Sequence, residues 1–285
     1  MNTLVYISND IKVRQSDIKI MIDNDMYFPN DLYKYKSIML ITNHGYISIQ
    51  SLYLLSRLGK PITISNLNGA HVYDLIPAKQ FSNYEIKIKQ IKALDFKDII
   101  ANKIIQQKQI NYNSLLQNYN LKTFDISINE KYFSRYYFKE LSKQFLQYGY
   151  DFRIRKGFYG MTNAKADNEI NALLNFTYGY IEHKLLFYID KSGLDYSISY
   201  LHNSDNYKLS LTYDIIELLR YKCDNIVLSM AKNKLIDKSL FDYTDYVKLK
   251  PDFIKKYVKI IDKHISVNDY NNVLNTFIGY LTVNN

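Results

Sequence analysis

The sequence predicts an α+β protein in which a β-sandwich-like N-terminal domain precedes a larger, all-α domain. Residues 1–78 contain short β-branched segments separated by turn residues. From Tyr84 onward the apolar residues recur at helical spacing instead. The chain has 285 residues and 47% hydrophobic content, which is enough for a sizeable core in one or two domains.

Five segments of the N-terminal part are predicted to be strands, because they alternate or are rich in β-branched residues and turn signals divide them. They are residues 4–7, 18–22, 37–42, 61–67 and 71–75. One helix is predicted between them, over residues 48–58, because Gly59 is a suitable C-cap and Pro61 follows it. A linker is expected at residues 79–84, so the helical domain would span residues 85–285.

A long lysine-rich and glutamine-rich helix is predicted over residues 84–112, where the apolar positions broadly follow a helical stripe. Its lysines are Lys87, Lys89, Lys92, Lys97, Lys103 and Lys108, and most of them are interpreted as a solvated face. Further helices are predicted over residues 129–147 and 167–194, and a last helix is expected to end near Leu281.

The most informative stretch runs over residues 195–220. Its second half has helical periodicity, and it carries Asp214, Glu217 and Arg220 at three-residue steps, which would place them on one side of a helix. His202 precedes them in a polar segment with loop character. A neutral imidazole beside two carboxylates can bind a metal. A solvated helix face, with Glu217 and Arg220 as an ordinary ion pair, is the alternative.

A second candidate site is basic. Arg153, Arg155 and Lys156 lie among aromatic residues and glycines within residues 151–160. Such a loop can hold phosphates by charge and can stack on bases or sugars, although basic residues are also common on solvated surfaces. The net charge of +9 and the pI of about 9.1 agree with a polyanionic partner.

Composition argues against several other classes. A single cysteine, Cys223, allows no internal disulfide, which agrees with a reducing cytosol. The N-terminus has no basic-then-apolar leader, and no apolar run approaches ~18 residues, so a cytoplasmic protein without a membrane partner is expected. There is no Gly-rich phosphate loop, no Cys/His zinc spacing and no nucleophile elbow.

Five short motifs occur in one order along the chain. They are EKYFSRYYF from residue 130, DNEINALLNFTY from 167, GLD from 193, SYLH from 199 and DIIELLR from 214. This order resembles that of the CRISPR-associated integrase family, the "Cas-one" endonuclease that inserts new spacers into CRISPR arrays. The chain departs from the family pattern at Lys131, where glycine is usual, and at Ser199 and Tyr200, which replace Gly-Phe.

The resemblance implies a divalent-metal site. The family's ligands fall, motif by motif, on Glu130, His202 and Glu217, and Asp214 is the matching nearby acid, either behind the ligands or an occasional ligand itself. The expected ion is Mg²⁺ or Mn²⁺, and one imidazole among carboxylates favours Mn²⁺. Arg135 and Arg220, with the 153–156 loop, would bind DNA and neutralise charge on the transferring phosphoryl group.

The activity implied is that of a metal-dependent DNA endonuclease and integrase. A 3′-hydroxyl at a spacer end would attack a phosphodiester, and water would replace that hydroxyl in the nuclease reaction. The resemblance also implies double-stranded or branched DNA as a partner, an asymmetric homodimer formed through the N-terminal domain, and the small "Cas-two" protein. Two alternatives remain: a catalytically inactive DNA-binding scaffold of the same fold, and a hydrolase of small phosphodiesters.

Overall fold

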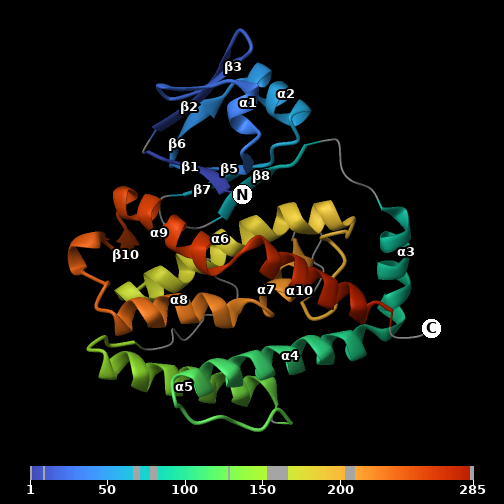
Figure 1. The fold of residues 1–285 in the computed structure, drawn as a ribbon, viewed down its shortest axis with the longest axis vertical. Coiled ribbons are helices and arrows are strands. Elements are labelled where there is room, and N and C mark those ends of the chain that lie inside the picture. The colour runs from blue at the N-terminus through green and yellow to red at the C-terminus, as the bar shows by residue number, and fades with distance from the viewer. Residues whose placement is uncertain are drawn as a thin grey trace.

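A β-rich N-terminal part stands on a larger helical part (Figure 1). The computed structural model describes residues 2–8, 10–66, 71–77, 83–127, 129–152, 166–202 and 209–282. Residues 78–82, which hold most of the predicted 79–84 linker, lie outside these ranges. Within the described residues, no helix is both long enough and apolar enough to cross a membrane.

The N-terminal part contains two four-stranded sheets. The first has the order β1 (Asn2–Ile7), β5 (Tyr35–Ile41), β7 (Ile62–Ser65) and β8 (His71–Leu75). Its first three strands are parallel, and β8 is antiparallel to β7. The second has the order β4 (Asp25–Tyr27), β3 (Lys19–Ile22), β2 (Asp10–Ser16) and β6 (His44–Ile47).

Both sheets contribute to one apolar core, which confirms the predicted β-sandwich-like arrangement. Ile11 and Val13 of β2 are buried while their neighbours in the strand are exposed, as alternation of side chains along a strand requires. They pack with residues of the first sheet, among them Ile38 and Leu40, and with Leu55 of helix α2 (Ile49–Arg57). The predicted strands correspond to β1, β3, β5, β7 and β8. Strands β2, β4 and β6 and the short helix α1 (Pro29–Leu32) were not predicted.

The helical part was predicted correctly in outline but not in its breaks. The predicted 84–112 helix is divided into α3 (Tyr84–Lys92), a 3₁₀ turn (Ala93–Phe96) and α4 (Lys97–Asn118). The following helices are α5 (Glu130–Gln147), α6 (Glu169–Ser192), α7 (Ser210–Ile216), α8 (Arg220–Lys232), α9 (Pro251–His264) and α10 (Val267–Tyr280). A short hairpin of β9 (Phe241–Tyr243) and β10 (Val247–Leu249) precedes α9, so the part predicted to be all-α contains two strands.

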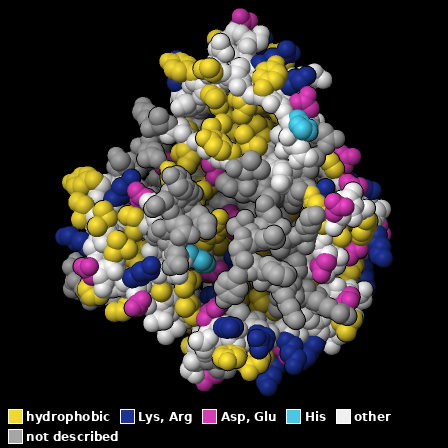
Figure 2. Space-filling model, turned by 180° about the vertical axis from the view of Figure 1, so that it is seen from behind, with side chains coloured by type: hydrophobic (Ala, Val, Ile, Leu, Met, Phe, Trp, Pro, Cys, Tyr) yellow, Lys and Arg dark blue, Asp and Glu magenta, His cyan; other side chains and the backbone are white. Residues whose placement is uncertain are grey.

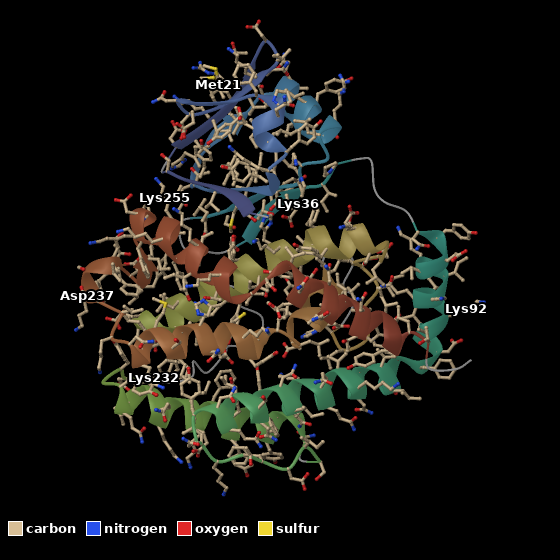
Figure 3. All side chains as sticks on the ribbon, viewed as in Figure 1. Met21, Lys36, Lys92, Lys232, Asp237 and Lys255 are labelled. Carbon is tan, nitrogen blue, oxygen red and sulfur yellow. The ribbon has the colours of Figure 1, made fainter. Side chains whose placement is uncertain are left out.

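Helix α6 is the centre of the helical part and also its contact with the first sheet. It is buried through most of its length and packs against α7, α8 and α10. On the side of the sheet, the ring of His183 hydrogen-bonds to Thr63 of β7 and to Ser37 of β5. Lys36 of β5 reaches toward the same helix, with Nζ 5.8 Å from the centre of the Phe187 ring (Figure 3). On the other side, α4 and α5 pack on α8 as an outer layer (Figure 1).

Candidate functional site

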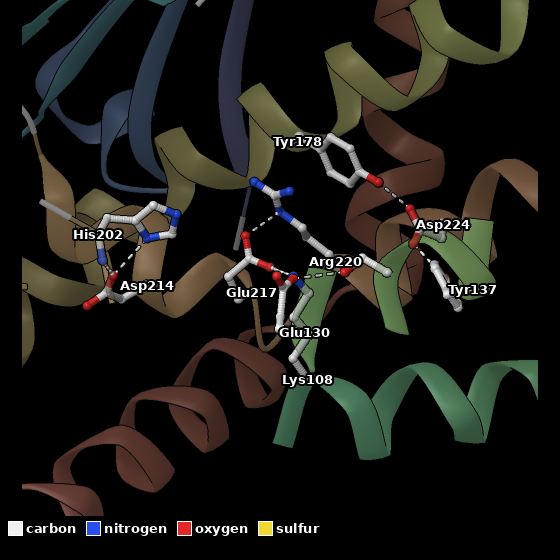
Figure 4. A network of polar contacts seen from close by, with 10 residues as sticks. Lys108, Glu130, Tyr137, Tyr178, His202, Asp214, Glu217, Arg220 and Asp224 are labelled. Atoms are coloured by element: carbon white, nitrogen blue, oxygen red, sulfur yellow. Dashed lines mark hydrogen bonds and ion pairs between the residues drawn. The ribbon is translucent and has the colours of Figure 1, made fainter. Parts of the chain in front are cut away.

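Two of the predicted acids converge on a single lysine between α4, α5 and α7 (Figure 4). Glu130 is the first residue of α5, and Glu217 follows the last residue of α7. Lys108 of α4 lies between them, with its Nζ 2.7 Å from Glu130 Oε1 and 2.7 Å from Glu217 Oε2. The structure therefore brings together two residues that are 87 positions apart in the sequence and holds them on one positive charge.

The predicted continuous helix through Asp214, Glu217 and Arg220 is wrong. Helix α7 ends at Ile216 and α8 begins at Arg220. Between them, the Leu218 and Leu219 amides donate to carbonyls three residues back instead of four. Asp214 consequently faces the segment that carries His202, whereas Glu217 faces Lys108, and the three residues do not form one exposed stripe.

Glu217 is ionised although it is buried. Burial works against its charged form, but the charges of Arg220 and Lys108 outweigh burial and lower the pKa of its carboxyl. Glu217 Oε1 lies 3.1 Å from Arg220 Nε, so the two carboxylate oxygens each face a different cation. Glu130 behaves similarly: burial opposes its charge, but Lys108 and the Ser134 hydroxyl lower the pKa of its carboxyl.

Asp214 is fully buried and positions His202. Its Oδ1 accepts hydrogen bonds from the His202 amide at 2.9 Å and faces His202 Nδ1 at 2.8 Å. Its Oδ2 accepts from the amides of Tyr200 and Leu201 at 2.6 and 3.1 Å. With Nδ1–H donating to this carboxylate, the neutral ring keeps its lone pair on Nε2, the form that binds a metal. These four contacts occupy both carboxylate oxygens of Asp214, so Asp214 acts on the site through His202.

Replacing Asp214 with alanine should therefore damage both stability and activity. We expect three backbone amides, those of Tyr200, Leu201 and His202, to lose their acceptor, at a cost of about 1–3 kcal/mol in the free energy of unfolding. Loss of the group that orients His202 should lower the DNA-cleaving activity that the motif resemblance implies by about 10–100-fold. Urea denaturation and cleavage assays of the same protein measure both effects. A loss of activity as complete as that of a Glu217 variant would instead make Asp214 a metal ligand.

Arg220 belongs to a buried network that the sequence did not reveal. Its guanidinium lies 5.2 Å from the centre of the Tyr178 ring, in cation–π contact. The Tyr178 and Tyr137 hydroxyls both donate to the carboxylate of Asp224, which is inaccessible to solvent (Figure 4). Burial raises the pKa of Asp224 to about 6, against the opposing effect of the two hydroxyls. This network fixes the aromatic ring on which Arg220 rests, and so the cation that faces Glu217.

The predicted DNA-contacting residues have different surroundings. Arg135 is exposed on α5, 6.0 Å from the centre of the Tyr132 ring, and is accessible to a partner. Arg220 is ion-paired with Glu217 inside the site. Arg153, Arg155 and Lys156 lie outside the described residues.

Lys108 does not fit the interpretation of most of these lysines as a solvated face. Its side chain is only 10% exposed and bridges the two acids. A signal for this was present in the sequence: Ile100, Ile104, Lys108 and Tyr112 recur at four-residue steps, and all four are buried. A lysine within an apolar stripe of a helix needs a buried partner, and here the partners are Glu130 and Glu217.

The donor set fits a divalent cation in part. The two carboxylates already surround one cation, the Lys108 ammonium. Among the described residues, no donor makes a hydrogen bond of acceptable geometry to the buried Glu217 Oε2, although Lys108 Nζ is close to it. The His202 ring lies near Glu217 in Figure 4. Within the described residues, however, no three His, Cys, Asp or Glu side chains converge closely enough to hold an ion.

Comparison with known proteins places this site in context. A family model described as CRISPR associated protein Cas1 matches residues 126–263. A CRISPR-associated endonuclease Cas1 from Fusobacterium nucleatum is 25% identical over 303 residues, covering 98% of this chain and 84% of the relative. The matched region of the family model contains Glu130, His202, Asp214 and Glu217.

Two solved structures share the fold. A CAS1 protein from Thermotoga maritima matches with a TM-score of 0.81 and 17% identity, over 99% of this chain and 97% of that protein. A casposase bound to its integration product matches with a TM-score of 0.80 and 22% identity, over 99% of this chain and 91% of that protein. At these identities the structural matches establish a common fold.

Proposed function

Because the chain belongs to the CRISPR-associated Cas1 family, we propose that it is a metal-dependent DNA endonuclease and integrase that inserts new spacers into a CRISPR array. The observation that carries the proposal is the convergence of Glu130 and Glu217 on one cation, with His202 oriented beside them by Asp214. Glu130, Glu217 and His202 Nε2 would hold one divalent ion, Mg²⁺ or Mn²⁺. The ion supplies Lewis-acid polarisation of a phosphodiester.

The reaction we propose is a transesterification. The 3′-hydroxyl oxygen of a spacer end forms a bond to the phosphorus of the target strand while the bond from phosphorus to the leaving 3′-oxygen breaks. The attacking hydroxyl loses its proton to solvent and the leaving oxygen gains one. In the nuclease reaction, water is the attacking group. Among the chain's own residues, Asp214 keeps His202 in its tautomer, and Arg220 keeps one oxygen of Glu217 in place.

A strand-transfer assay tests this proposal. We expect the purified protein to join a labelled DNA end to a branched or duplex target when Mn²⁺ or Mg²⁺ is present and to lose this activity with a chelator. An excess of unlabelled duplex should compete, whereas a small phosphodiester should not. Binding without any strand transfer or cleavage in either metal would favour the inactive DNA-binding scaffold.

We also propose that the protein pairs through its N-terminal part and works with the small Cas-two protein, as family membership implies. Hydrophobic side chains gather on the exposed surface of the N-terminal part (Figure 2). Large exposed apolar side chains of this part include Ile18, Tyr33, Ile49 and Tyr53, of which Ile49 is 81% exposed. Apolar surface of this kind is typical of protein–protein contacts.

DNA binding by the basic loop has a measurable signature. Each phosphate contact releases counterions, so the logarithm of the affinity for duplex DNA should fall with the logarithm of salt concentration by about 0.9 per contact. Replacing Arg153, Arg155 and Lys156 together with alanine should flatten that slope by about 2–3 and weaken binding to all sequences alike. Titrations of labelled duplex without metal measure the slope. An unchanged slope would exclude the loop as a phosphate-binding site.

A further inference from the structure

Lys108 occupies the position between the two acids that a metal ion would be expected to take. Its Nζ is 2.7 Å from Glu130 Oε1 and 2.7 Å from Glu217 Oε2, and its side chain is 10% exposed. It extends from α4, where Tyr112 follows one turn later, and Nζ lies 5.7 Å from the centre of that ring. The lysine is thus held by its helix, by an aromatic ring and by both carboxylates.

Among the four side chains that meet at this position, the formal charges balance. Glu130 and Glu217 carry two negative charges, and Lys108 and Arg220 carry two positive charges. A divalent ion added to this group would place two more positive charges within a few ångströms of the ammonium, whose side chain is only 10% exposed. Repulsion between them would be strong there, because the effective dielectric constant is low. The ion and the ammonium therefore exclude one another.

Each acid also has a second partner that does not depend on Lys108. Glu217 Oε1 faces Arg220 Nε at 3.1 Å. Glu130 Oε1 accepts a hydrogen bond at 2.8 Å from Ser134 Oγ, one turn later on the same helix. The two carboxylates can therefore keep their places when the ammonium leaves, while Glu217 Oε2 becomes free to meet another cation.

We propose that Lys108 is the cation of the metal-free site, and that a divalent ion binds between Glu130 and Glu217 by displacing the ammonium. This rests on the proposed function, because it assumes the same metal site. Lys108 then has two opposing effects. It is a positioning residue that keeps two like charges together before the metal arrives, and it competes with the metal, so it raises the concentration of ion that the protein requires.

The test measures metal binding without DNA and without turnover. The full-length protein is titrated with Mn²⁺ by calorimetry, in parallel with Lys108→Met, which removes the charge and keeps a long apolar side chain. We expect Lys108→Met to bind Mn²⁺ about tenfold or more tightly, because the competing charge is gone. Its melting temperature without metal should be lower than that of the wild type, and the difference should shrink at saturating Mn²⁺.

Lys184 supplies a matched control. It is a second buried lysine, on α6, but its ion-pair partner is Asp262 at 2.6 Å and not Glu130 or Glu217, and it lies 5.2 Å from the centre of the Tyr180 ring. Lys184→Met should bind Mn²⁺ with wild-type affinity. A second variant, Lys108→Arg, keeps the charge and adds donors, so it should bind Mn²⁺ more weakly than the wild type and serves if Lys108→Met does not fold.

The outcomes separate the two hypotheses. Displacement would be overturned if the wild type binds Mn²⁺ and Lys108→Met binds it equally well or more weakly. It would also be overturned if Lys108→Arg binds Mn²⁺ with unchanged affinity. In both cases the metal site itself would stand. Lack of Mn²⁺ binding by all of these proteins would remove the metal site on which the proposed function rests, and displacement with it. Displacement would be supported if Lys108→Met is the one variant of the three that binds Mn²⁺ more tightly than the wild type.

Discussion

Replacing Glu217 with glutamine should abolish strand transfer and DNA cleavage, with a loss of at least about 10²–10³-fold. Glutamine has nearly the same shape, but it removes the buried charge that Lys108 and Arg220 surround. A neutral amide cannot balance a divalent cation, and its nitrogen would face either Lys108 or Arg220. Single-turnover assays at several Mn²⁺ concentrations measure the loss, and thermal unfolding establishes that the variant is folded.

Glu140→Gln is the matched control for this experiment. Glu140 lies on α5, as Glu130 does, and it is mostly buried and ion-paired with Lys143, but it has no contact with Lys108. It should retain near wild-type activity. If Glu217→Gln kept more than about a tenth of the wild-type rate, Glu217 would not be a ligand of the catalytic metal.

Replacing Arg220 with alanine should cost about 3 kcal/mol of stability. The change removes one of the two cations that compensate the charge of buried Glu217, and it removes the cation–π contact with Tyr178. Urea denaturation measures the free energy of unfolding. Arg220→Lys, which keeps the charge but stacks less well, should lose distinctly less.

A double variant distinguishes this explanation from a simple loss of packing. In a protein that already carries Glu217→Gln, Arg220→Ala leaves no buried negative charge without its partner. The two substitutions together should therefore reduce the free energy of unfolding by less than the sum of their separate effects. Strict additivity would show that Arg220 stabilises the protein through contacts other than its ion pair with Glu217.

The sequence predicted the overall architecture because the relevant patterns are local. Alternating and β-branched segments indicated the sandwich-like N-terminal part. Helix α2 ends at Arg57, and Leu58 is its C-cap, directly before Gly59. The break at residues 217–219 could not be read in the same way. Leu218 and Leu219 are both buried, so apolar residues continue at a spacing that fits a tight turn as well as an α-helix.

The role of Lys108 depends on contacts between distant segments. Its partners are 22 and 109 positions away, and only the packing of α4 and α5 against α8 brings them together. The motif resemblance indicated Glu130, His202 and Glu217 as ligands but gave no information about what balances two acids without metal. The tyrosine pair on Asp224 was missed for the same reason, because Tyr137, Tyr178 and Asp224 lie on three different helices.

The most direct test of the proposed metal site is anomalous diffraction from crystals of the protein soaked in Mn²⁺. We expect one peak between α5 and the turn after α7, where Glu130, Glu217 and His202 Nε2 would hold the ion, with the Lys108 ammonium moved away. A structure with Lys108 still between the two acids and manganese bound elsewhere, or nowhere, would contradict the metal site proposed for this protein.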